Sequence, residues 1–161
     1  MMTGIDIHIV GIGNLGISFL EGFKSLKDNT CLYLYENNIE TIKNLESSYS
    51  VTTDIDQIDS GVLLLCIKPN NLNEFINVNK SKISDQVLIA SPLAGVSINH
   101  FENHFKNKVL RLMPNLAIKN NSGFIPYTKN YDEDYLHFIE KLNHLGQTNE
   151  YPEDLFDIIT A

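Results

Sequence analysis

The chain has 161 residues, 43% of them hydrophobic, a length that suits one well-packed domain and is short for two. Twenty acidic and 12 basic residues give a formal net charge of −8 at pH 7, spread along the chain, which argues against binding to nucleic acid or to an anionic membrane. The longest apolar runs are too short to span a membrane, and the first residues, MMTGID, lack the order of a signal peptide, so we expect a cytoplasmic protein.

Apolar runs rich in Val, Ile, Leu and Tyr alternate with segments of helical periodicity, a pattern typical of a parallel sheet with helices between its strands. The runs predict strands at 5–10, 31–36, 49–52, 61–67, 86–91 and 108–113, with two further short strands at 123–128 and 147–151. The helical segments are 14–26, 39–45, 72–78, 98–105 and 133–145. Several strands are apolar on both faces, as expected where helices cover both sides of a sheet. The last helix is expected to bury a stripe of Leu136, Ile139, Leu142 and Leu145.

Three glycines, Gly11, Gly13 and Gly16, follow the first strand in the sequence GIGNLG and open the first helix. A GxGxxG string alone is not specific, but here it lies in a strand–helix–strand unit of the length found in dinucleotide-binding proteins. The first glycine permits a tight turn, the second lets the backbone approach a pyrophosphate, and the third lets the helix pack against the strand. The sequence therefore predicts a Rossmann-like, doubly wound α/β fold, with a mostly parallel sheet, helices on both faces and a dinucleotide site at this loop.

Glu36 stands about 20 residues after the glycine loop, at the end of the second predicted strand. A carboxylate there accepts hydrogen bonds from the ribose hydroxyls of NAD and repels the additional phosphate of NADP. No arginine lies beside Glu36, and the nearest cation along the chain is Lys43. These residues favour NAD, although Asn37 and Asn38 carry amide groups that can donate to a phosphate, so NADP stays an alternative.

The positions of cysteine and histidine predict neither a metal site nor a catalytic nucleophile. Cys31 and Cys66 each lie in an apolar run, so we expect two buried, reduced thiols and no disulfide. His100 and His104 fall on one face of a predicted helix. A zinc protease would have Glu directly after the first histidine, where Phe101 stands, so no metal is expected here.

Three segments end later strands of the predicted sheet: LLLCIKPNN at 63–71, SPLAGVS at 91–97 and LRLMPNLAIKNNSG at 110–123. The carboxyl ends of parallel strands meet at one edge of a sheet, so these segments and the glycine loop should converge on one crevice. Lys68 is better explained by a contact with a cofactor phosphate or ribose than as a solvated lysine. Arg111, the only arginine in the chain, is better explained as a buried donor to loop carbonyls than as a substrate contact.

In their order and spacing, these segments resemble the pyrroline-5-carboxylate reductases of proline biosynthesis. The landmarks of that family are a strand followed by GxGNM, then VKPQ, AG[VI], RxMPN and a closing E-x-x-x-D-x-[VI]-T-A. This sequence has GIGNLG, IKPN, AGVS, RLMPN and EDLFDIITA in the same order, and the likeness covers nearly the whole chain. The resemblance implies an oxidoreductase in which NADPH or NADH delivers hydride to the C=N carbon of 1-pyrroline-5-carboxylate, a small cyclic imine, to yield L-proline.

The resemblance also assigns cofactor-binding residues by position. It implies that the pyrophosphate is held by Ile12, Gly13, Asn14 and Leu15, that the ribose and nicotinamide side is lined by Cys66, Lys68 and Pro69, and that the nicotinamide is flanked by Ala94 and Gly95. It assigns no catalytic side chain to this part of the chain, because the cofactor carries the chemistry. Many family members have Ser or Arg where Glu36 and Asn37 stand, so Glu36 favours NADH and the family favours NADPH.

The family also implies a second domain. In its members the run into TA continues as SGSGPA and a helical domain that forms the dimer and most of the substrate pocket, and these 161 residues contain no such segment. We therefore expect residues 1–152 to form the Rossmann-like domain and 153–161 to begin the connection to the helical domain. Alone, the chain should bind the dinucleotide and reduce the imine poorly or not at all. The alternatives are a non-catalytic dinucleotide-binding or sensing module and another hydride-transfer enzyme of related fold.

Overall fold

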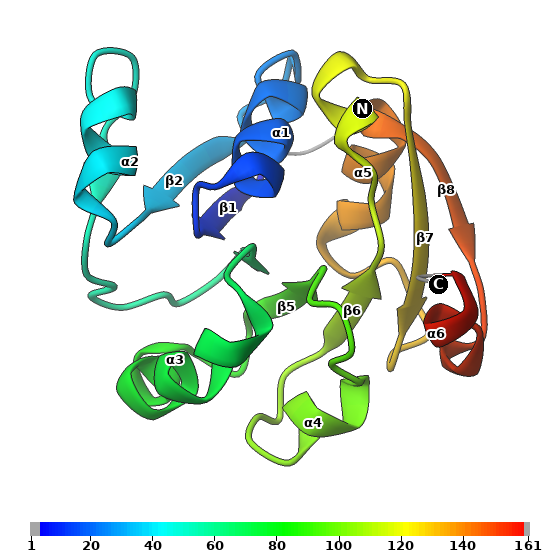
Figure 1. Ribbon diagram of the computed structural model, residues 1–161. Coiled ribbons are helices and arrows are strands. Elements are labelled where there is room, and N and C mark those ends of the chain that lie inside the picture. The colour runs from blue at the N-terminus through cyan, green and yellow to red at the C-terminus, as the bar shows by residue number, and fades with distance from the viewer. Residues whose placement is uncertain (1–3, 160–161) are drawn as a thin grey trace.

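The computed structural model describes residues 4–159, without the side chain of Ile159, and its strands form one sheet in the order β3-β2-β1-β4-β5-β6-β7-β8 (Figure 1). The strands are β1 (Asp6–Val10), β2 (Cys31–Tyr35), β3 (Val51–Thr52), β4 (Val62–Leu65), β5 (Leu88–Ser91), β6 (Val109–Leu112), β7 (Gly123–Lys129) and β8 (Gly146–Glu150). Each overlaps a predicted strand, with bounds that differ by at most two residues, so the strand predictions are confirmed.

The topology of the sheet creates a crevice beside β1. Strands β1 to β6 are parallel, β7 is antiparallel to β6, and β8 is parallel to β7. The chain passes from β1 outward to β2 and β3, then returns to the other side of β1 with β4. Open α/β sheets bind ligands at the carboxyl ends of the strands where the chain reverses direction in this way. The structure confirms a Rossmann-like, doubly wound and mostly parallel sheet.

Helices cover both faces of the sheet. Figure 1 shows α1 (Asn14–Phe23) and α5 (Phe138–Leu145) on one face of the sheet and α3 (Leu72–Asn79) and α4 (Ile98–Glu102) on the other. Leu45 of α2 (Ile39–Leu45) packs into the same hydrophobic core as α1. The last described helix, α6 (Phe156–Ile159), follows β8. In β4, the fully buried Leu64 packs into the hydrophobic core beneath α1 and α5, and its neighbours Leu63 and Leu65 pack into the core beneath α3 and α4. A strand covered on both sides has no polar face, which accounts for its continuous apolar run. None of the described helices is long and apolar enough to cross a membrane.

The helix ends differ from the predictions at three places. The helices predicted at 14–26 and 98–105 end earlier, at Phe23 and Glu102. The helix predicted at 133–145 begins only at Phe138, because Leu136 and His137 have left-handed backbone conformations, with φ of 59° and 55°. The predicted stripe was therefore wrong in its first half: α5 buries Phe138, Lys141, Leu142 and Leu145.

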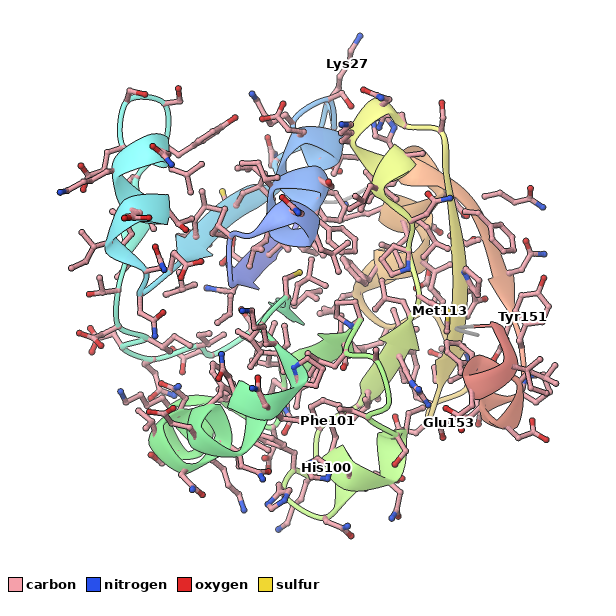
Figure 2. The ribbon with its side chains drawn as sticks, in the orientation of Figure 1. Lys27, His100, Phe101, Met113, Tyr151 and Glu153 are labelled. Carbon is pink, nitrogen blue, oxygen red and sulfur yellow. The ribbon has the colours of Figure 1, made fainter. Side chains whose placement is uncertain are left out.

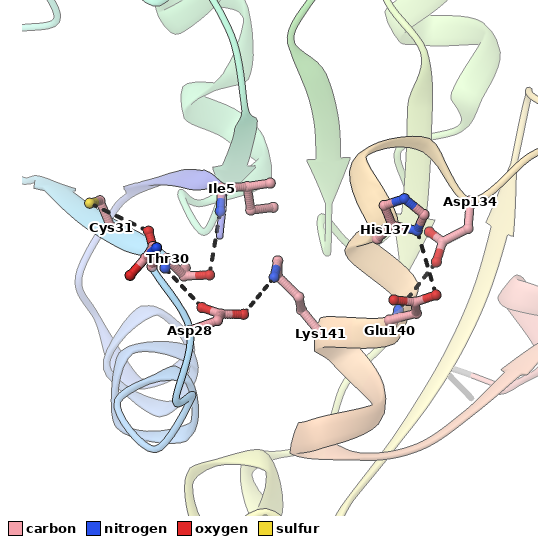
Figure 3. A network of polar contacts seen from close by, with 9 residues as sticks. Ile5, Asp28, Thr30, Cys31, Asp134, His137, Glu140 and Lys141 are labelled. Atoms are coloured by element: carbon pink, nitrogen blue, oxygen red, sulfur yellow. Dashed lines mark hydrogen bonds and ion pairs between the residues drawn. The ribbon is translucent and has the colours of Figure 1, made fainter. Parts of the chain in front are cut away.

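A buried ion pair joins the loop before β2 to α5 (Figure 3). Lys141 has a fully buried side chain, and its Nζ atom lies 2.8 Å from Oδ2 of Asp28, whose side chain is 8% exposed. The other carboxylate oxygen of Asp28 accepts the backbone N–H of Thr30 at 2.8 Å. The pair therefore ties two segments 113 residues apart to the same side of the sheet.

Residues 153–161 were expected to begin a connection to a further domain; in the described part of this segment, Glu153 and Phe156 contact the domain. Phe156 is fully buried, and the guanidinium of Arg111 lies 5.0 Å from the centre of its ring. Thr160 and Ala161, the last two residues of the family-like closing motif, lie outside the described residues.

Candidate dinucleotide-binding site

A cleft of about 800 Å³ opens at the carboxyl ends of the first four strands. Its walls are the glycine loop after β1, residues 35–38 and Thr41 at the end of β2 and beyond it, residues 53–55 after β3, residues 66–68 after β4, and one side of α3. These segments meet because β2, β1 and β4 are neighbours in the sheet. The cleft thus lies at the crevice that the topology predicts.

The protein's own packing requires glycine at two positions of the loop, Gly11 and Gly16, but not at the third, Gly13. Gly11 has a φ of +89°, and an added Cβ would lie 2.7 Å from the carbonyl oxygen of Cys66. At Gly16 an added Cβ would overlap the carbonyl oxygen of Gly11, so the fold itself requires both glycines. Gly13 has an ordinary φ of −84°, and an added Cβ would meet nothing within 4 Å. The protein does not need glycine there, and the open backbone fits the close approach of a phosphate group.

The first turn of α1 has backbone N–H groups that no side chain of its N-cap satisfies. The N-cap residue is Gly13, which has no side chain, and no acidic residue lies in the first turn. In contrast, Asn38 caps α2 by accepting from the N–H of Thr41 at 3.0 Å, and Ser97 caps α4 through the N–H of His100. Uncapped N–H groups and the positive end of the helix dipole are suited to binding an anion.

Glu36 joins the glycine loop to the β2–α2 loop. Its Oε2 atom accepts the backbone N–H of Ile12 at 2.8 Å, and Oε1 accepts those of Asn37 and Asn38 at 2.8 and 2.9 Å. These three contacts hold both loops in place at the cleft. They also occupy three of the roughly four lone-pair directions that a carboxylate offers.

The cleft carries more negative than positive side chains. The described residues that line it include three carboxylates, from Glu36, Asp54 and Glu74, and one cation, Lys68. Lys68 is exposed and directly precedes Pro69, which starts a short 3-10 turn before α3. Lys68 and the backbone N–H groups would therefore attract an anionic ligand in the cleft, and the Glu36 carboxylate would repel it.

The two cysteines differ in environment. Cys66 lines the cleft, and burial raises the pKa of its thiol, so that the thiol is neutral near pH 7. Cys31 is exposed, so the prediction of two buried thiols was wrong for this residue. Cys31 and Tyr33 point to the same face of β2, and both are exposed.

The structure brings together six of the thirteen predicted cofactor-binding residues around the cleft: Gly11, Gly13, Glu36, Asn37, Cys66 and Lys68. Two of the others, Ile12 and Gly16, are buried beneath the loop. Asn14 and Leu15 start α1, Pro69 follows Lys68, and the exposed Ala94 and Gly95 belong to the loop after β5.

Several lining residues were missed in the sequence. Thr53, Asp54 and Ile55 follow the two-residue strand β3, and Glu74 and Phe75 lie on α3. No motif marks these positions, since they reach the cleft only through the packing of the strands. Asn38, which the sequence suggested only as a donor to a phosphate, also lines the cleft and caps α2.

Outside the cleft, the structure tests the prediction for Arg111 and adds one polar cluster that the sequence did not predict. Arg111 is buried and bonded within the protein, as expected, but it donates to the carboxylate of Glu153 rather than to loop carbonyls. The cluster Asp134, His137 and Glu140 brings three possible metal ligands within 4.8 Å (Figure 3). The Asp134 carboxylate accepts backbone N–H groups of Ile139 and Glu140, so the start of α5 already accounts for its position.

Relatives of known name match nearly the whole chain. It is 25% identical over 99% of its length to "Pyrroline-5-carboxylate reductase" of Methanosarcina acetivorans, of which it covers 63%. It is 30% identical over 96% of its length to the protein of the same name from Aquifex aeolicus, of which it covers 60%. The chain thus spans about 60% of the length of these relatives. No protein-family model matches it.

Solved structures show the same fold. The 1-pyrroline-5-carboxylate reductase of Streptococcus pyogenes has a TM-score of 0.79 at 23% identity, over 98% of this chain and 62% of that one. The pyrroline carboxylate reductase of Plasmodium falciparum with NADP bound has a TM-score of 0.78 at 20% identity, over 97% of this chain and 60% of that one. By sequence, the chain is a homologue of proteins named pyrroline-5-carboxylate reductase, and it shares the fold of the solved structures of that name.

Proposed function

We propose that the chain is the dinucleotide-binding part of an NAD(P)H-dependent pyrroline-5-carboxylate reductase, which forms L-proline from 1-pyrroline-5-carboxylate in proline biosynthesis. The single observation that carries the proposal is the open space at Gly13 beside the uncapped start of α1. No protein atom would contact a Cβ at this position, so the glycine is explained by a ligand rather than by packing. Homology over nearly the whole chain supports the reaction class. Two cysteines without a disulfide suit a reducing compartment, and we assign the protein to the cytoplasm on that ground.

In this proposal the chain binds and orients the cofactor. The N–H groups at Gly13 and at the first turn of α1 hold the pyrophosphate, and Lys68 supplies the one nearby positive charge. Three interstrand spacings, about 14 Å, separate β2 from β5, a span that an extended dinucleotide can bridge. With its adenosine ribose at Glu36, the cofactor would place its nicotinamide toward Ala94 and Gly95. The bound reduced nicotinamide supplies the hydride for the imine carbon.

We further propose that the cofactor is NADH. The Glu36 carboxylate accepts the N–H groups of Asn37 and Asn38, which would otherwise be free to donate to the additional phosphate of NADPH. It also places a negative charge where that phosphate would lie. Since three of its lone-pair directions are used, the carboxylate has room to accept one ribose hydroxyl rather than two.

The proposed function is tested by calorimetric titration of the chain with NADH and NADPH, together with an assay of proline formation from the cyclic imine. Binding of NADH supports the dinucleotide site, and proline formation supports the reductase. Binding without any turnover, also in the presence of the helical part of a homologous reductase, would favour a dinucleotide-sensing module. Absence of binding for both dinucleotides would refute the proposal.

Replacement Glu36→Ser is expected to change the cofactor preference. The variant loses the repelling carboxylate and frees the N–H groups of Asn37 and Asn38, so the affinity for NADPH relative to NADH should rise about tenfold, or about 1.4 kcal/mol. The measurement is the ratio of the two dissociation constants by calorimetry. Glu40→Ser, at an exposed position on α2 that does not line the cleft, is the control and should leave the ratio unchanged. An unchanged ratio in Glu36→Ser would show that another group sets the preference.

A further inference from the structure

Glu153 connects three segments that are far apart in the sequence. Its Oε1 atom accepts the backbone N–H of Ile98, the first residue of α4, at 2.7 Å, and the Nη1 of Arg111 on β6 at 3.0 Å. Figure 2 shows Glu153 between α6 and α4. Charge-assisted hydrogen bonds of this kind are stronger than those between neutral groups. The carboxylate therefore fixes the start of α4 to the end of the described chain.

The segment that carries Glu153 is itself firmly docked. Phe156, three residues later, is fully buried, and the Arg111 guanidinium lies over its ring. Arg111 is 5% exposed, so its contact with Glu153 is largely shielded from water. The docking of residues 153–156 thus determines where the Glu153 carboxylate stands.

The loop between β5 and α4 is anchored at both ends and exposed in the middle. At its start, the N–H of the buried Leu93 donates to Oγ of Ser91 at 3.3 Å. At its end, the N–H of Ile98 donates to Glu153 at 2.7 Å. Between these anchors, Ala94 and Gly95 are exposed, and Gly95 has a φ of +72°. The position of these two exposed residues therefore depends on the second anchor, Glu153.

We propose that Glu153 is a positioning residue that holds the loop Pro92–Ser97 against the nicotinamide half of the cofactor, so that docking of the segment Glu153–Ile159 controls that half of the site. This inference rests on the proposed function. The adenosine half is built by other segments, after β1 to β4, whereas the hydrogen bonds of Glu153 among the described residues go to Ile98 and Arg111. Loss of Glu153 should therefore affect the two halves of the site differently.

The experiment compares two ligands that share the adenosine and pyrophosphate groups. ADP-ribose lacks the nicotinamide, and its binding is followed by calorimetry; NADH has it, and its binding is followed by the rise in nicotinamide fluorescence as the ring leaves water. Glu153→Ala should weaken NADH binding roughly tenfold and reduce the fluorescence rise, because the N–H of Ile98 loses its acceptor. Binding of ADP-ribose should stay within about twofold.

Two further variants separate positioning from folding. Glu153→Gln keeps a carbonyl oxygen for the N–H of Ile98 and should recover most of the NADH signal. Glu102→Ala, at an exposed position at the end of α4, is the matched control and should behave as the unmodified chain.

The proposal is overturned if the affinities for NADH and ADP-ribose fall together in both Glu153 variants, since Glu153 would then support the fold as a whole rather than the nicotinamide half of the site. It is also overturned if neither ligand is affected in Glu153→Ala. If the unmodified chain binds neither ligand, the proposed function fails, and this outcome is distinguishable because it appears before any substitution is made.

Discussion

Replacement Gly13→Ser is expected to weaken dinucleotide binding about a hundredfold or more, about 2.7 kcal/mol, without loss of stability. A side chain at this position meets nothing in the protein within 4 Å, and its φ of −84° suits any residue. Serine is also a good N-cap, so the start of α1 should stay intact. The new Cβ and hydroxyl would occupy the space through which a pyrophosphate reaches the backbone N–H groups. Affinity is measured by calorimetry with NADH, and stability by urea unfolding.

Gly16→Ala is the contrasting variant. Its Cβ would overlap the carbonyl oxygen of Gly11, so the fold itself should lose about 1–3 kcal/mol of stability. Loss of binding in this variant would follow from loss of structure, whereas loss in Gly13→Ser would not. If Gly13→Ser bound NADH as tightly as the unmodified chain, the pyrophosphate would have to lie elsewhere, and the proposed site would be wrong.

Replacement Lys141→Met is expected to destabilise the protein by about 3–5 kcal/mol, because it leaves the carboxylate of Asp28 buried without its cation. Methionine has a similar length and fits an apolar position, so packing is largely conserved. The measurement is the free energy of unfolding in urea. The control is Lys27→Met, at an exposed lysine that points into solvent in Figure 2, which should change stability by no more than about 0.5 kcal/mol.

The double variant Asp28→Asn with Lys141→Met tests whether the uncompensated charge is the cause. It buries no charge and keeps an oxygen for the N–H of Thr30, so it should lie within about 2 kcal/mol of the unmodified chain. A double variant as unstable as Lys141→Met would contradict this explanation and indicate that the lysine acts through its packing.

The same pair predicts a loss of stability in acid. Burial acts to raise the pKa of Asp28, but the hydrogen bonds from Lys141 and Thr30 outweigh it, and the pKa is lowered overall. A carboxyl whose pKa is lowered by folding contributes stability above its unfolded pKa of about 3.9 and loses that contribution as the pH falls through the folded value. Below about pH 4 the unmodified chain should therefore lose stability relative to the double variant, which lacks this carboxylate.

Local sequence patterns predicted most of the secondary structure, and the largest difference, at the start of α5, has a local physical cause. The helix at 39–45 matches its predicted bounds, since Asn38 caps its start and its periodicity is regular. The helix before Leu145 starts five residues late, because Leu136 and His137 adopt left-handed conformations that side-chain periodicity does not reveal. Lys141 faces the core there, where it pairs with Asp28, a residue far away in the sequence.

For the candidate site as well, local patterns predicted some features and the packing of distant segments decided the others. The sequence by itself determined the glycine loop, the acidic residue after β2 and the resemblance to a reductase family, since these depend on residue types at short, regular spacings. Only the tertiary structure decided that Gly13 is free of contacts while Gly11 and Gly16 are not, that Glu36 binds three backbone N–H groups, and that Glu153 pairs with Arg111 and α4. Those contacts join segments brought together by the order of the strands, and strand order depends on the packing of the whole sheet rather than on any one stretch of the chain.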